Sequence, residues 1–348
     1  MKPERQIRVG DLRNKRLSKH RAFLLALCIL PLTLASMTFA QGQGGPQMRK
    51  HTATKVQTFR LVPTTQKLSV KNSQSDQTVG NKRILKSNGI PAHRVGIFPN
   101  QGNPHTITEQ NYRFSVPAYP KPAAVITSAH DNQGTGNQRG APNRPFGIAL
   151  NGVLFDPGTA EFWNGDRSAN WNYEALGGSI GLGLDGNHAH VQPTGAYHYH
   201  GLPENYLVEL GVKRNRHSPQ VGWAADGFPI YALYGYQNPE NTRSKIVEMT
   251  SSYRLKRGKR PGGNNGPGGK YDGAFLRDYE FIEGSGSLDE CNGRFCVTPE
   301  FPDGTYAYFL TNKWPVVPRN FRGTPAELRS ENRGQQGKRR DGRRRRNQ

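Results

Sequence analysis

Glycine and proline interrupt the middle of this chain so often that long helices and long strands are excluded. The 348 residues include 41 Gly and 25 Pro. Between residues 96 and 321 they recur roughly every 8–12 residues, a spacing typical of turns in all-β domains. No long apolar run with helical periodicity lies between them. The pattern predicts a mainly β, sandwich- or barrel-like single domain of short strands with long loops and one or two short helices.

Two short segments make this prediction specific. Residues Gly147–Phe155 form two apolar runs around an Asn-Gly dipeptide, which is a strong signal for a β-hairpin. Residues Glu204–Leu210 are the best candidate for a short helix.

The net charge of +22 is carried by the two ends of the chain and not by its middle. Residues 96–321 contain 20 basic and 20 acidic side chains, so the other 28 basic and 6 acidic residues account for the whole excess. A neutral block of this size can bury its own core. We therefore predict a basic, mostly disordered linker over 41–95, a domain over 96–323 and a disordered Arg-rich tail over 324–348.

The first 40 residues have the composition of an export signal. A basic stretch precedes the uncharged segment Ala22–Leu34, and Thr38 and Ala40 place small residues before Gln41. We predict a signal peptide over 1–40 and a secreted or periplasmic protein; the alternative is an uncleaved signal anchor. No other run is long enough to span a bilayer, so we expect no transmembrane span in the mature chain.

Export also bears on the partners of the basic ends. Export separates the protein from cytoplasmic nucleic acid, so we expect no nucleic acid partner for the Arg-rich tail. The basic ends suit anionic polymers or lipid headgroups instead.

Four histidines within thirteen residues are the strongest candidate for a functional site. The pairs His188/His190 and His198/His200 each have the HxH spacing that places both side chains on one face of a strand. Between the pairs, residues 192–195 read Gln-Pro-Thr-Gly. This sequence suits a type I turn followed by a left-handed Gly, which gives a three-residue hairpin loop with a bulge.

The length of that loop decides which side chains meet. With three residues, His190 lies opposite His198 and His188 opposite His200, so all four imidazoles share one face. With two or four residues the register shifts by one, and Tyr197 and Tyr199 face the first histidine pair instead. The positions of Pro and Gly favour the three-residue loop.

Clustered neutral imidazoles suit Cu or Zn better than Ca or Mg. We therefore predict a metal site with Cu or Zn as the cofactor, and its ligands are His188, His190, His198 and His200. The alternative is a polar ladder of hydrogen-bonded histidines without metal. Four further residues are candidates for supporting the ligands, namely Asp185, Tyr197, Tyr199 and Asp226. Both aspartates precede Gly, so turn formation is their simpler role.

Cys291 and Cys296 are the two cysteines that remain once the predicted signal is removed. They flank a short segment that contains Gly, and an exported protein meets an oxidising compartment. We predict a disulfide between them; the alternative is two free thiols.

The sequence is similar to a known family in several blocks. The tetrapeptide Tyr197–His200 reads YHYH, for which the YHYH-domain family is named. Gly147–Gly158, Val221–Tyr231 and Asp289–Leu310 resemble further blocks of that family in the same order. The resemblance covers roughly 96–323. It implies an exported, mostly bacterial domain and implies no particular activity.

Two functions fit these residues. The first is an exported metal-binding protein, with or without catalytic activity. The second is a non-catalytic binding or structural module of the cell surface, with a His–Tyr core and basic ends for anionic polymers. We find no Walker A loop, nucleophile elbow, HExxH or Rossmann fingerprint, so the sequence names no reaction.

Overall fold

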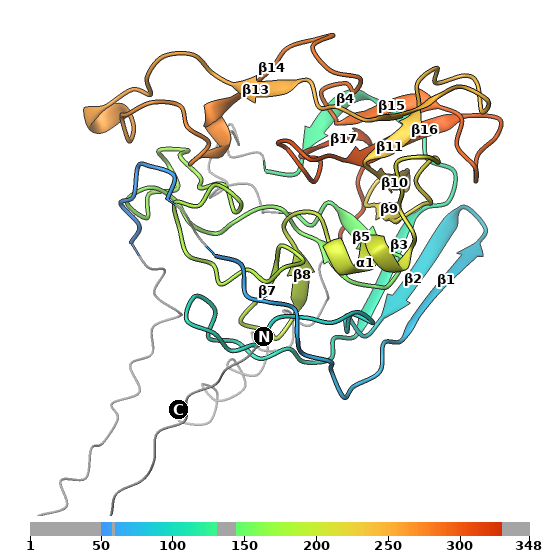
Figure 1. The fold of residues 1–348 in the computed structure, drawn as a ribbon, viewed down its shortest axis with the longest axis horizontal. Coiled ribbons are helices and arrows are strands. Elements are labelled where there is room, and N and C mark those ends of the chain that lie inside the picture. The colour runs from blue at the N-terminus through green and yellow to red at the C-terminus, as the bar shows by residue number, and fades with distance from the viewer. Residues whose placement is uncertain (1–49, 58–59, 131–143, 329–348) are drawn as a thin grey trace, which may run out of the picture. The chain divides into compact units, whose positions relative to one another are not determined.

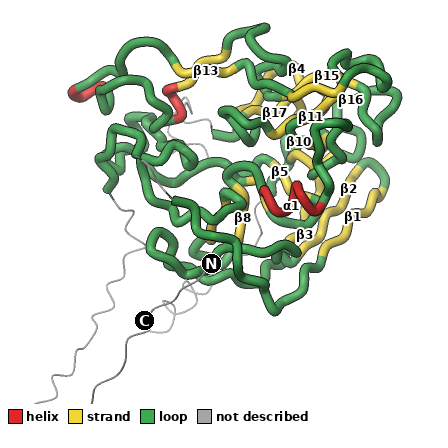
Figure 2. The backbone as a smooth tube through the Cα atoms, viewed as in Figure 1, coloured by secondary structure: helices red, strands yellow, loops and turns green. Residues whose placement is uncertain are grey.

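The computed structural model describes residues 50–57, 60–130 and 144–328. The predicted signal peptide over 1–40 and the Arg-rich residues from 329 onward lie outside this part of the chain. Among the described residues, no helix is long and apolar enough to cross a membrane. Short strands joined by long loops dominate the chain (Figures 1 and 2), so the predicted mainly β fold is confirmed. None of the described sheets closes into a barrel.

The largest sheet has eight strands of mixed direction. In spatial order they are β15 (Gly293–Cys296), β16 (Thr305–Leu310), β10 (Pro229–Ala232), β9 (Gly222–Ala224), β5 (Gly147–Ala149), β6 (Leu154–Phe155), β8 (Tyr197–Tyr199) and β7 (Ala189–Val191). The pairs β10–β16 and β6–β8 are parallel and the others are antiparallel. The β7 strand lies at one edge of the sheet.

The remaining strands form smaller sheets of two or three. The three-stranded sheet contains β1 (Gln74–Val79), β2 (Lys82–Ser87) and β3 (Tyr112–Pro117). The two-stranded sheets pair β4 (Pro122–Ser128) with β17 (Asn320–Gly323), β11 (Tyr234–Tyr236) with β12 (Ile246–Glu248), and β13 (Tyr253–Leu255) with β14 (Tyr279–Phe281).

Helices are few and short in the described residues, as the sequence predicts. The α1 helix spans Glu204–Glu209 and buries Tyr206 and Leu207, which confirms the predicted helix. Two 3₁₀ turns follow, η1 (Gly263–Asn265) and η2 (Leu276–Asp278).

The predicted hairpin over Gly147–Phe155 is also confirmed, as β5 and β6. Its turn is closed by hydrogen bonds from the Gly152 amide to the Ala149 carbonyl and from the Ala149 amide to the Val153 carbonyl, each 2.8 Å long. Gly152 has a φ of +82°, which glycine adopts without strain. This hairpin matters for the site because β6 is the parallel neighbour of β8, which carries the YHYH tetrapeptide.

The predicted linker over 41–95 is wrong for its described C-terminal half. Residues 74–87 form the β1–β2 hairpin, whose turn contains Gly80 at a φ of +56°. Leu85 of β2 is buried in the main core, and β2 pairs with β3. A Gly-Asn dipeptide between two strand-like runs is a recognised hairpin signal even within a basic, polar segment such as this one. At the other end Leu328 is buried, so the packed chain continues past residue 323.

The predicted disulfide is also wrong, since Cys291 and Cys296 are both free and buried. Cys296 is the last residue of β15, and Cys291 precedes that strand. Four residues of extended chain advance about 10 Å, whereas a disulfide requires Cα atoms within roughly 7 Å. The two side chains accordingly pack in different core clusters. The Gly between the cysteines starts a strand instead of a tight loop.

Candidate metal centre

The hairpin between β7 and β8 has the register that a three-residue loop predicts. His190 lies opposite His198, and the Gln192 amide donates a 2.9 Å hydrogen bond to the Ala196 carbonyl. Within the loop, the Gly195 amide donates to the Gln192 carbonyl at 2.8 Å, and Gly195 has a φ of +83°. The alternative register is therefore excluded, and the tyrosines do not share a face with the histidines.

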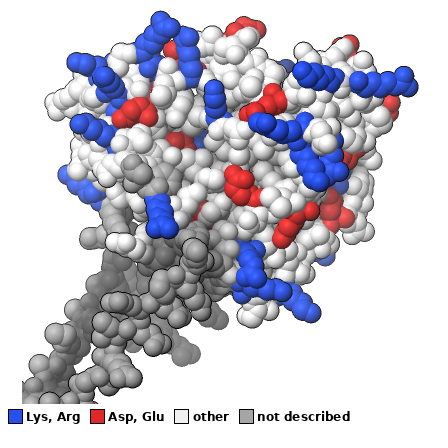
Figure 3. Space-filling view, in the orientation of Figure 1, with Lys and Arg blue, Asp and Glu red and all other residues white. Residues whose placement is uncertain are grey.

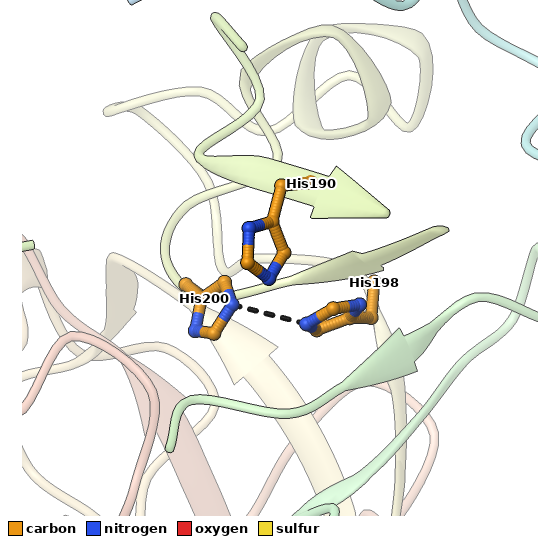
Figure 4. A group of neighbouring side chains, drawn as sticks. All are labelled: His190, His198 and His200. Carbon is orange, nitrogen blue, oxygen red and sulfur yellow. Dashed lines mark hydrogen bonds between the residues drawn. The ribbon is translucent and has the colours of Figure 1, made fainter. Parts of the chain in front are cut away.

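Three of the four predicted ligands come together. One ring nitrogen from each of His190, His198 and His200 lies within 4.8 Å of the others. We call these residues the histidine triad. Figure 4 shows His190 reaching from β7 toward His198 and His200. All three pairs of ring centroids are 4.7 Å apart, and the Nε2 atoms of His198 and His200 are 3.0 Å apart.

Backbone carbonyls fix which nitrogen of two triad rings carries the proton. The Nδ1 atom of His190 lies 3.0 Å from the Leu182 carbonyl, and that of His198 lies 3.2 Å from the Ala196 carbonyl. A carbonyl only accepts, so each Nδ1–H donates and each neutral ring keeps its lone pair on Nε2. In metal sites such a hydrogen bond orients the histidine ligand. The free Nε2 lone pair of His198 is on the side that faces His200.

Burial keeps the triad uncharged. It lowers the pKa of His190 from 6.5 to about 4 and the pKa of His198 to about 3. The pKa of His200 lies well below 6.5, first because of burial and then because of the neighbouring imidazoles. Neutral imidazole is the form that binds transition metals. At neutral pH the three rings therefore need lose no proton before they bind an ion.

His188 does not join the triad, although its backbone has the predicted register. The His200 amide donates a 2.8 Å hydrogen bond to the His188 carbonyl, as expected for opposite residues. However, His188 has a φ of +51°, outside the β region, and precedes the first residue of β7. Its Nδ1 atom donates to the Leu202 carbonyl at 2.8 Å. The prediction that all four imidazoles share a face is therefore wrong, because the rule of alternating faces holds only for extended backbone.

The two tyrosines of the tetrapeptide are fully buried on the other face of β8. Tyr197 donates a 2.8 Å hydrogen bond to the Asp185 carboxylate. The Tyr199 hydroxyl lies 2.6 Å from Nε2 of His93 and accepts from the Asn151 amide at 2.9 Å. The tyrosines thus anchor the hairpin to its surroundings on the face away from the histidine triad.

Neither predicted aspartate belongs to the triad. Asp185 accepts hydrogen bonds from the amides of Gly96, Asn187 and Ala189, which makes it a turn former before β7. Asp226 accepts from the Tyr308 hydroxyl at 2.5 Å and from the Gly323 amide at 2.8 Å. It therefore ties β17 to the turn between β9 and β10. Turn formation, the simpler role predicted for both aspartates, fits both residues.

Two residues that the sequence did not single out act on the triad through their charge. His105 lowers the pKa of His190, and Arg319 lowers that of His200, in each case after the larger effect of burial. Arg319 is itself held by buried Glu174, whose two carboxylate oxygens each lie 2.9 Å from its Nη2. No sequence pattern links these residues to the hairpin, because they come from segments distant in the chain.

The comparison with protein families matches the part of the chain that contains the histidine triad. The family described as YHYH protein matches residues 114–323, which is 210 of the 348 residues. No curated protein and no solved structure matches the chain. The match includes the whole β7–β8 hairpin.

Proposed function

The chain belongs to the YHYH protein family, and from this premise we propose that it is an exported protein whose histidine triad binds one transition-metal ion, Cu or Zn. The observation that carries the proposal is the convergence of three neutral imidazoles on one hairpin, with His198 and His200 buried and His190 half-buried. Export is supported by the composition of residues 1–40, which resembles a signal peptide.

The His198 and His200 rings form a hydrogen bond without metal (Figure 4), and the spacing of their nitrogens also fits two ligands of one ion. With metal–nitrogen bonds of about 2.0–2.1 Å, two ligand nitrogens lie about 2.9 Å apart at a right angle and about 3.3 Å apart in a tetrahedron. The 3.0 Å between Nε2 of His198 and Nε2 of His200 falls in this range. Three protein ligands leave one tetrahedral position free, and an ion there would act as a Lewis acid toward a bound molecule.

Metal analysis of the purified protein tests this proposal. After loading with Zn²⁺ or Cu²⁺ and removal of excess ion, we expect one ion per chain in the unaltered protein. The variant His190→Gln should fall well below that value, whereas His188→Gln should keep it. Circular dichroism of both metal-free variants checks that the fold is retained. Well under one ion per chain in the unaltered protein would overturn the proposal.

A second candidate function is attachment to an anionic polymer, and one surface feature favours it. The segment around β13 and β14 presents a cationic patch of exposed or half-exposed side chains, namely Lys256, Arg257, Lys259, Lys270 and Arg277. No described carboxylate forms an ion pair with any of them. Figure 3 shows Lys and Arg side chains gathered on the upper left, where Figure 1 draws these strands.

Retention on heparin-agarose tests the attachment. We expect the full chain to elute at a salt concentration that falls when Lys256 and Lys259 are both changed to Glu, because exposed charges act through screened attraction. The matched control changes Arg243 and Lys245, which are also exposed but outside the patch. Equal loss of retention in both variants would show a general charge effect and contradict a role for the patch.

A further inference from the structure

The three-stranded sheet of β1, β2 and β3 (Figure 1) has one buried face and one exposed face. In β2 the exposed Lys86 lies between the buried residues Leu85 and Ser87. The β3 strand has the same alternation, and its exposed Arg113 also lies between two buried residues. Since alternate residues of a strand face opposite sides of the sheet, Lys86 and Arg113 both point to the exposed face.

On the exposed face these two cations are neighbours. Lys86 lies directly opposite Arg113 in the antiparallel register, and Ser75 of β1 lies opposite Lys86 on its other side. Like charges on directly opposite residues repel and destabilise a sheet. Among the described residues, neither cation forms an ion pair. The three strands contain one carboxylate, Asp76, and it bonds to Arg83 on the other face. An anion bound between the two cations would relieve their repulsion.

The same two side chains line a hollow of about 480 Å³. This volume falls in the range of pockets that hold a small molecule, so the hollow has room for more than a single ion. Three exposed polar residues also line it, namely Ser73, Ser75 and Asn111. Their hydroxyl and amide groups both donate and accept hydrogen bonds, as the hydroxyls of a sugar do. The hollow therefore combines a pair of cations with groups that suit a polyhydroxylated ligand.

We infer that this hollow binds an acidic saccharide, a sugar unit that carries an oxyanion such as carboxylate or sulfate. The oxyanion lies between Lys86 and Arg113, where the planar guanidinium donates two parallel hydrogen bonds to two of its oxygens. The sugar hydroxyls pair with the serines and with Asn111. The site lies in a different sheet from the histidine triad, so the inference goes beyond the proposed metal binding and does not depend on it.

Isothermal titration calorimetry of the full chain tests the inference with three sugars that share one ring: galacturonate, galactose 6-sulfate and neutral galactose. We expect one acidic sugar to bind per chain, at least about tenfold more tightly than galactose, because hydrogen bonds to charged groups are the stronger ones. The tighter of the two acidic sugars identifies the oxyanion. Affinities that are equal for all three sugars, or no binding of any, would overturn the inference. Acetate that binds as tightly as galacturonate would overturn the saccharide in favour of a simple anion.

A third lysine or arginine of the same face supplies the matched control. We expect Arg113→Gln and Lys86→Gln each to weaken binding of the acidic sugar by at least about tenfold. Lys82 is also exposed and on the same face of β2, but it lies opposite Pro117, about 13 Å along the strand from Lys86. Lys82→Gln should therefore change the affinity by less than about twofold. Equal weakening by all three variants would show a general charge effect and contradict the site.

Two further variants separate this site from the proposed functions. Binding of galacturonate should be unchanged in His190→Gln, which lacks a triad ligand, and in the double variant of Lys256 and Lys259, which lacks part of the cationic patch. Loss of galacturonate binding in the double variant would assign the sugar to the cationic patch and overturn the hollow. Circular dichroism checks that each variant keeps the parent fold, which we expect because Lys82, Lys86 and Arg113 are all exposed.

Discussion

Each side chain of Tyr197–His200 has partners that its position along β8 and the residue after it dictates. Alternate residues of a strand face opposite sides of a sheet, so the tyrosines face the network around Asp185 and His93 while the histidines face His190. The two faces have different energetic roles. Tyrosine hydroxyls satisfy buried polar groups and hold the hairpin in place, whereas the histidines direct ring nitrogens toward one another. One tetrapeptide thus combines an anchor with a candidate ligand set.

The division of roles predicts different effects of substitution on the two faces. Tyr197→Phe removes the hydrogen bond to Asp185 and keeps the ring, so we expect the free energy of unfolding to fall by about 1–3 kcal/mol. Metal content should stay unchanged, because the hydroxyl lies on the face away from the triad. Urea unfolding and metal analysis of the same preparation measure both. A loss of metal from the folded variant would contradict this assignment.

At the scale of elements, the β7–β8 hairpin depends on one loop. Gly195 has a φ of +83°, and a Cβ added there would overlap the side chain of Thr108, whose amide donates a hydrogen bond to the Gly195 carbonyl. The same residue therefore sets the hairpin register and allows the close approach of residues 103–108. These two requirements come from different parts of the chain and meet at a position without a side chain.

Substitution of Gly195 tests that double requirement. Gly195→Ala combines backbone strain with overlap, so we expect it to destabilise the protein by more than about 1 kcal/mol. Gly165→Ala is the control, since Gly165 also has a positive φ (+70°) but no atom within 4 Å of an added Cβ. Urea unfolding of both variants gives the difference. Equal destabilisation would mean that the contact with Thr108 costs nothing.

Buried neutral histidines set the pH response of the whole molecule without metal. The pKa values of His190 and His198 are about 4 and about 3 in the folded protein and 6.5 when unperturbed. The unfolded chain therefore binds more protons below pH 6.5, and stability is lost as the pH falls from there toward the folded pKa values. Buried Asp185 and Asp226, whose pKa values are raised by burial, act in the opposite direction as the pH falls through those raised values.

We therefore expect the free energy of unfolding to drop between about pH 7 and about pH 4, by on the order of 3 kcal/mol for each of the two histidines. Urea unfolding of the metal-free protein across this range measures the drop. The variant His198→Gln lacks one of the titrating groups, so its stability should depend less steeply on pH. Identical slopes for the variant and the parent would contradict the burial of a neutral His198.

Local patterns in the sequence determined the parts of this protein that depend on neighbours in the chain. The hairpin register follows from the Gln-Pro-Thr-Gly loop, and the short strands follow from the Gly and Pro spacing. Only the tertiary structure decided the rest. His188 has a left-handed backbone, the cysteines lie apart along an extended strand, and hydrogen bonds from Asn103 and Thr108 hold a remote segment beside the β7–β8 hairpin. Turn and strand rules describe forces between residues a few positions apart, whereas packing between remote segments chooses which side chains finally meet.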